Sequence, residues 1–174
     1  MLRKTSRSAM GLAVAVVAMM AACARARRDT GPSASAAADT IALERSACYG
    51  TCPVYRVLIL GDGQVHVTGD SARRANARRA VDPSAFAALE ARATAIGFYR
   101  LPAKTRKDQT LCPLPATDHP TITIGIVKRG ARTRVEDYTG CYLTADPLRR
   151  APELLAFAAL ARAIDSVAGT RGPR

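Results

Sequence analysis

Five cysteines are the residues of this chain whose type and spacing could do chemistry. Cys23 stands alone near the N-terminus, whereas Cys48, Cys52, Cys112 and Cys141 form an even set further along. Even sets of cysteines in an oxidising compartment form disulfides, and four cysteines allow three pairings. Among these we favour Cys48 with Cys52, as a clip across a tight loop, and Cys112 with Cys141, across a late hairpin.

The spacing of Cys48 and Cys52 raises the alternative of a thiol–disulfide site. Dithiol oxidoreductases place two residues between their cysteines and hold them at a helix N-terminus, where the dipole lowers the thiol pKa. Here three residues intervene, and the flanking segments alternate as strands do. The spacing therefore favours a structural disulfide over redox work.

A metal site or a catalytic site is the next alternative. Cys48, Cys52, His66 and His119 make a Cys2His2 set by residue type, but neither histidine has a spacing typical of a zinc ligand. Asp118 and His119 are adjacent, yet no serine lies in a nucleophile elbow that would use them. We therefore predict no metal, no cofactor and no catalytic residue, and favour a non-enzyme.

The first residues predict export. Three basic residues precede a run of 13 apolar or small residues from Met10 to Ala22. This is the layout of a secretory signal, and it is shorter than the ~20 residues of a transmembrane helix. Met20-Ala21-Ala22-Cys23 resembles a bacterial lipobox, in which the cysteine is lipidated and becomes the new N-terminus. We expect a signal peptide over residues 1–22 and a lipid on Cys23. Ordinary secretion, with cleavage after Ala24 or Ala26, is the alternative.

The segment after the predicted cleavage site is predicted to be a flexible tether. Residues 23–39 carry no large apolar side chain and cannot offset the entropy of ordering. A flexible linker of this length places a folded domain roughly 20–24 Å from the membrane. The lipid on Cys23 then makes the membrane a partner of the chain at the cell envelope. Ala24 slightly favours the outer membrane, provided that enterobacterial sorting applies.

The charge of the chain is strongly positive. Lys and Arg number 26 and Asp and Glu 14, which gives +12, and removing residues 1–22 with their three basic residues leaves +9. The predicted export and the absence of Trp argue against nucleic acid as a binding partner. The basic loop with Arg73, Arg74, Arg78 and Arg79 is a candidate contact for anionic lipids or an acidic envelope protein. The alternative is a solvated loop in an Arg-rich chain.

Alternation and turn signals predict the elements that position these residues. Five strands are expected at 40–45, 54–60, 64–68, 121–127 and 133–138. One helix begins at Asp82-Pro83 and ends at Gly97, and a last helix opens at Asp146-Pro147 or restarts at Pro152. Residues 69–81 are expected to be a loop, and residues 98–119 to be irregular.

The order strand, hairpin, helix, hairpin, helix predicts an α+β domain over residues 40–168. Its antiparallel sheet would have about five strands, with both helices packed on one face, because this layout buries every apolar stripe. Residues 169–174 would form a frayed tail.

Several motifs along this domain resemble one family. They are the run from Arg45 to Tyr55 with its CxGxCPxY pattern, Gly61-Asp62-Gly63, Asp118-His119-Pro120-Thr121, Tyr138 with Gly140, and Ile164-Asp165. Together they resemble bacterial domain-of-unknown-function family 6438. The resemblance implies an exported bacterial domain, often a lipoprotein, and assigns no functional residue.

These observations predict a disulfide-clipped domain, tethered at the envelope, that acts by binding or structural interaction. A thiol–disulfide or metal-handling module centred on Cys48 and Cys52 is the alternative.

Overall fold

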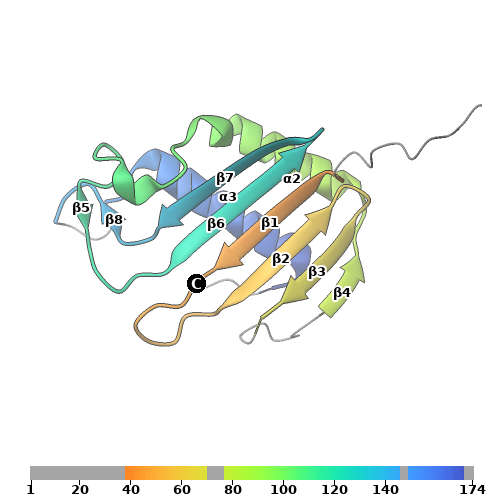
Figure 1. Cartoon of the computed structure of the whole chain (residues 1–174), viewed down its shortest axis with the longest axis horizontal. Coiled ribbons are helices and arrows are strands. Elements are labelled where there is room, and N and C mark those ends of the chain that lie inside the picture. Colours follow the sequence, from red (N-terminus) through yellow and green to blue (C-terminus); the bar gives the residue numbers. More distant parts are fainter. Residues whose placement is uncertain (1–37, 70–76, 146–148, 171–174) are drawn as a thin grey trace, which may run out of the picture. The chain divides into compact units, whose positions relative to one another are not determined.

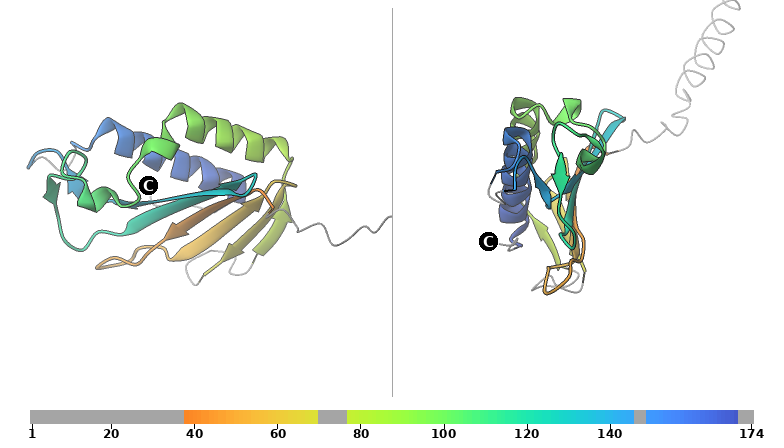
Figure 2. Two further views of the ribbon diagram at one scale, coloured as in Figure 1. Left: turned by 45° about the horizontal axis from the view of Figure 1, so that its top comes forward. Right: turned by 90° about the vertical axis from the view of Figure 1, so that its left-hand side faces the viewer.

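The computed structural model describes residues 38–69, 77–145 and 149–170 of the chain. A six-stranded antiparallel sheet has the order β4-β3-β2-β1-β6-β7 (Figure 1). Its strands are β1 (Thr40–Arg45), β2 (Tyr55–Leu60), β3 (Gln64–Thr68), β4 (Ala77–Ala80), β6 (Thr121–Lys128) and β7 (Ala131–Tyr138). Two helices cover one face of this sheet (Figure 2). The predicted α+β class is confirmed, with one strand more than expected.

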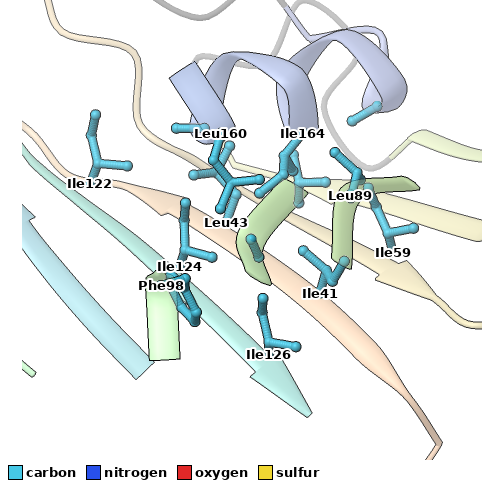
Figure 3. Close-up of a cluster of buried hydrophobic side chains, with 14 of the residues drawn as sticks. Ile41, Leu43, Ile59, Leu89, Phe98, Ile122, Ile124, Ile126, Leu160 and Ile164 are labelled. Carbon is cyan, nitrogen blue, oxygen red and sulfur yellow. The ribbon is translucent and has the colours of Figure 1, made fainter. Parts of the chain in front are cut away.

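The core lies between the sheet and the helices. Every second residue of the inner strands points toward the helices, and these side chains are almost completely buried. Figure 3 shows this cluster, which includes Ile41, Leu43, Ile59, Ile124, Ile126, Leu160 and Ile164. The alternation in the sequence therefore identified the core face correctly.

The sixth strand, β4, lies where a loop was expected, and that prediction was wrong. β4 pairs with β3 and places Arg78 opposite His66. None of its four residues is fully buried, and Ala77 alone packs against the core, so this edge strand shows no apolar alternation. The segment 98–119, expected to be irregular, contains two 3-10 turns, η2 (Phe98–Arg100) and η3 (Thr105–Lys107). It also contains β5 (Leu114–Pro115), which pairs with β8 (Cys141–Tyr142) in a small second sheet.

The two helices begin and end close to their sequence signals. α2 spans Ser84–Ala95 with Pro83 at the N-cap position, and the carboxylate of Asp82, the predicted cap one residue earlier, accepts a hydrogen bond from the Ser84 N–H at 2.8 Å. α3 spans Pro152–Ala168, so the restart at Pro152 is the helix start among the described residues. The other proposed start, Asp146-Pro147, lies outside them. No described helix is long and apolar enough to cross a membrane.

The chain enters the sheet at Asp39, which ties two turns together. The Asp39 carboxylate accepts a hydrogen bond from the Arg129 N–H at 2.7 Å, and its carbonyl accepts one from the Gly61 N–H at 2.8 Å. Asp39, assigned above to the linker, thus bonds to both the β2–β3 and the β6–β7 turns. The loop after Arg45 lies at the other end of β1, roughly 20 Å away at ~3.4 Å per residue.

Candidate functional site

The loop from Ser46 to Val54 joins β1 to β2 and is closed by a disulfide. Cys48 and Cys52 are bonded, with their Cα atoms 5.6 Å apart, as favoured from the sequence. Both cysteines are half-buried, whereas the Tyr49 side chain between them is 90% exposed. Gly50 has φ +121°, a conformation that L side chains rarely adopt. We call residues 46–54 the clipped loop. It displays one tyrosine to solvent.

A buried carboxylate on α3 holds the base of the clipped loop. Asp165 Oδ2 accepts hydrogen bonds from Arg45 Nη2 at 2.6 Å and Arg45 Nε at 3.2 Å. Asp165 Oδ1 accepts from the Tyr55 hydroxyl at 2.5 Å and the Thr170 hydroxyl at 2.7 Å. Arg45 ends β1 and Tyr55 begins β2, so one carboxylate fixes both ends of the loop. We call these four residues the Asp165 clamp.

The flank of the clipped loop is bonded to the turn before β6. Ser46 N–H donates to the Thr121 carbonyl at 3.0 Å, and Thr121 N–H donates to the Ser46 hydroxyl at 2.8 Å. Tyr49 N–H donates to the Asp118 carbonyl at 3.3 Å. Asp118 takes the left-handed conformation with φ 64°, which aspartate tolerates better than most residues. The loop and the Asp118-His119 turn therefore form one surface.

Three aromatic rings pack together at this turn. His119 packs edge-on against Tyr138 and Tyr142, with ring centroids 6.3 Å and 5.8 Å apart. Its Nε2 lies 3.5 Å from the Tyr142 hydroxyl. The Tyr138 hydroxyl accepts from the His119 N–H at 3.2 Å and donates to the Ala116 carbonyl at 2.8 Å. The Asp-His-Pro-Thr and Tyr-x-Gly motifs, separate in the sequence, thus meet in one cluster.

Gly140 is needed for this packing. A Cβ at position 140 would lie 2.8 Å from Tyr138 Cε1 and 2.9 Å from His119 Cδ2, which is too close for real contacts. Gly140→Ala is therefore expected to displace the His119 ring and to cost about 1–3 kcal/mol, as overpacking does. The measurements are denaturant unfolding and the NMR chemical shifts of the His119 ring protons. Gly130→Ala is no control for space alone, because φ is +81° there. Thr117→Ser, at an exposed site, should leave both measurements unchanged.

The second disulfide is buried in a small core of its own. Cys112 and Cys141 are bonded, as favoured from the sequence, and both are fully buried. Leu154 and Ala151 of the α3 region pack against them. The bond links β8 to the segment before β5, and the Ala116 N–H adds a hydrogen bond to the Gly140 carbonyl at 2.8 Å. The small sheet is thereby attached next to the aromatic cluster.

A second buried carboxylate positions the same region. Arg150 Nη2 donates to Asp137 Oδ1 at 2.9 Å and Oδ2 at 3.0 Å, and the Thr105 hydroxyl donates to Oδ1 at 3.2 Å. Arg150 Nε also donates to the Cys141 carbonyl at 3.2 Å. Burial raises the pKa of Asp137 above its ordinary value, and the Arg150 guanidinium opposes this increase. The charge pair thus joins β7 to the disulfide and η3.

Within the Asp165 clamp, the Tyr55 hydroxyl is expected to lose its proton at a higher pH than an ordinary tyrosine does. Burial, reinforced by the hydrogen bond to Asp165, raises the pKa of Tyr55 from 10.0 to about 12. Because the unfolded chain loses this proton first, up to about 3 kcal/mol of stability present below pH 10 should be lost as the pH rises toward 12. Tyrosinate absorbance and urea unfolding measure the two effects. Tyr55→Phe should remove the late step, and an unchanged absorbance curve in this variant would contradict the assignment.

The other predicted site residues are not brought together. Arg73 and Arg74 lie outside the described residues. Arg78 and Arg79 are exposed neighbours on β4 whose side chains point to opposite faces of the sheet, with the Arg79 guanidinium near Gly169. Contact of these arginines with an anionic surface stays a prediction.

The four residues considered for a metal are dispersed as well. Cys48 and Cys52 are bonded to each other, His119 lies in the aromatic cluster, and His66 lies on the sheet face that the helices leave uncovered. In the part of the chain that the structure describes, no group of three His, Cys, Asp or Glu side chains is arranged to hold a metal ion.

Sequence reasoning missed the two buried carboxylates. Asp165 follows Ile164 within an otherwise apolar helix face, and Asp137 follows Val135 at the spacing of the buried strand face. An acid at a position where the pattern requires an apolar residue was the available signal, because a buried charge needs a partner. Nothing in the sequence identified Arg45 and Arg150 as those partners among so many arginines.

The comparisons with known proteins agree with the resemblance drawn from the motifs. The model of the family described as "Domain of unknown function (DUF6438)" matches residues 39–157, and its match begins at the residue that ties the two turns. No curated protein matches the chain. Since the match covers more than half of the sequence, the chain belongs to the DUF6438 family.

Proposed function

We propose that this chain is an exported lipoprotein, anchored through Cys23, whose domain binds a partner at the cell envelope and does not catalyse a reaction. The main support for export is the buried Cys112–Cys141 disulfide. Both sulfur atoms lie inside a small apolar core, so this part of the fold is complete only after oxidation. Compartments that oxidise thiols lie outside the cytoplasm.

The lipid rests on the sequence around Cys23, and mass spectrometry tests it. The full-length chain is expressed in bacteria, and the mature protein should begin at Cys23 and carry a diacylglyceryl group. Cys23→Ser should incorporate no labelled fatty acid. A mature wild-type protein that begins after Ala24 or Ala26 and carries no lipid would overturn the anchor while leaving the export in place.

The binding role is supported by the surface around the clipped loop. Tyr49 is displayed on a loop that is fixed by a disulfide, by the Asp165 clamp and by the turn before β6. Rigid exposed aromatic side chains are typical of binding surfaces, because little conformational freedom is lost on contact. The surface lies at the end of β1 opposite to Asp39.

The half-exposed Cys48–Cys52 bond keeps a thiol–disulfide module as a second candidate. The Asp165 clamp, however, places the last turn of α3 at the base of the loop, and the C-terminal end of a helix is the negative end of its dipole. A negative potential disfavours the thiolate that redox work requires. Catalysed reduction of a disulfide substrate by the full-length protein, lost in the Cys48→Ser, Cys52→Ser double variant, would establish the second candidate.

A further inference from the structure

Three segments that meet at one end of the domain contain no charged residue. They are residues 46–54, 109–117 and 139–145, which we call the uncharged end. In a chain of which 23% is charged, these 25 residues would carry about six charges at the average frequency. The absence is therefore local and not a property of the whole sequence.

Direct contacts join the three segments. The Cys112–Cys141 disulfide, the β5–β8 pairing and the bond from the Ala116 N–H to the Gly140 carbonyl connect the second segment to the third. The clipped loop is bonded to Asp118, which follows the second segment directly. Figure 1 shows the clipped loop and the segment leading into β6 projecting at the same end of the sheet, and the left view of Figure 2 agrees. The exposed Asp118 lies at the rim of this surface, and so does the exposed Arg106, whose guanidinium carbon lies 4.7 Å from the centroid of the Tyr138 ring.

The uncharged end also carries most of the large apolar side chains that the described residues expose. Five such side chains are exposed, and three belong to this end: Tyr49 at 90%, Leu114 at 48% and Val54 at 38%. The other two, Tyr99 and Leu155, lie on η2 and α3. Protein interfaces have this composition at their centres, where charged residues are depleted and tyrosine is enriched.

We infer that the uncharged end is a docking surface for another protein, which receives Tyr49 of the clipped loop in an apolar cleft. The loop protrudes and is closed by a bond, so it fits a concave partner. A membrane surface fits less well, because anionic head groups attract Lys and Arg, and these segments contain neither. The inference rests on the proposed binding role and is independent of the lipid on Cys23.

The test is photo-crosslinking of the full-length protein in the bacterium that makes it. Benzoylphenylalanine replaces Tyr49 in one strain and Leu114 in a second. Matched controls carry it in place of Tyr99, a tyrosine that is 41% exposed, and of Leu155, which is 50% exposed. We expect one discrete adduct with another protein from positions 49 and 114, at a yield about tenfold or more above that from positions 99 and 155.

Point variants then measure the contact with the protein identified in the adduct. Tyr49→Ala should weaken its binding about tenfold or more, as loss of a hot-spot tyrosine does, whereas Tyr99→Ala should leave it unchanged. Equal yields at all four positions, an adduct made only of this chain, or attachment to lipid at position 49 would each overturn the inference. An adduct from position 155 alone would leave the binding role standing and place it on another face. No adduct from any position would overturn both.

Discussion

Replacement of Asp165 with alanine is expected to lower the free energy of unfolding by about 3–5 kcal/mol, the effect of removing one partner from a buried ion pair. Arg45 would remain almost fully buried without a counter-charge, and the Tyr55 hydroxyl would lose its acceptor. In urea the unfolding midpoint should fall by roughly 2 M, given a slope of ~2 kcal/mol per molar urea.

Two variants separate the charge from general damage to α3. Asp165→Asn keeps the side-chain volume and an acceptor for Tyr55 but removes the charge, so it should lie between the wild type and the alanine variant. Arg162→Ala changes an exposed residue of the same helix and should shift stability by less than about 0.5 kcal/mol. A loss below about 1 kcal/mol in Asp165→Ala would show that Arg45 finds water or another acceptor, and the clamp would then not hold the loop.

The second large effect is expected from the two disulfides, which should differ in both stability and access. Loop closure predicts about 3.5 kcal/mol for the Cys112–Cys141 bond, with its sequence separation of 29, and about 2 kcal/mol for the Cys48–Cys52 bond, with a separation of 4. Double replacement by alanine and denaturant unfolding measure these values. Replacement of Cys112 and Cys141 should lower the free energy of unfolding still further, because their sulfur atoms fill a core.

The same contrast predicts the order of reduction. A mild reductant under native conditions should open the half-exposed Cys48–Cys52 bond and leave the fully buried Cys112–Cys141 bond intact. Alkylation followed by peptide mapping should then find label on Cys48 and Cys52 alone. Equal labelling of all four cysteines would mean that the small core opens as readily as the loop.

The sequence was sufficient for the main features of the fold, because burial repeats with the period of each element. Ile122, Ile124 and Ile126 alternate, and Leu154, Phe157 and Ile164 recur at helical spacing, so the core face of each element could be assigned. Strand β4 was not predicted because none of Ala77–Ala80 is fully buried and Ala77 alone packs against the core, so the segment shows no alternation, although it pairs with β3. The periodicity of a sequence indicates which residues are buried, but it does not identify a strand at the edge of a sheet.

The candidate site was only partly predictable, for a different reason. Count and compartment predicted two disulfides but allowed three pairings, and the observed pairing was favoured because one pair spans a tight loop and the other a late hairpin. The Asp165 clamp joins residues 120 positions apart, and the His119 cluster depends on the turn at Asp118 and on the space at Gly140. Such contacts depend on tertiary geometry, which local pattern does not encode.

The position of Asp39 has a mechanical consequence. β1, the strand that the linker enters, lies inside the sheet and is hydrogen-bonded to β2 on one side and to β6 on the other. A pull on the N-terminal side of the domain would therefore act along β1, loading both ladders in shear together with the Asp39 bonds to the two hairpin turns. An edge strand pulled along its axis would load one ladder, whereas β1 loads two ladders at once.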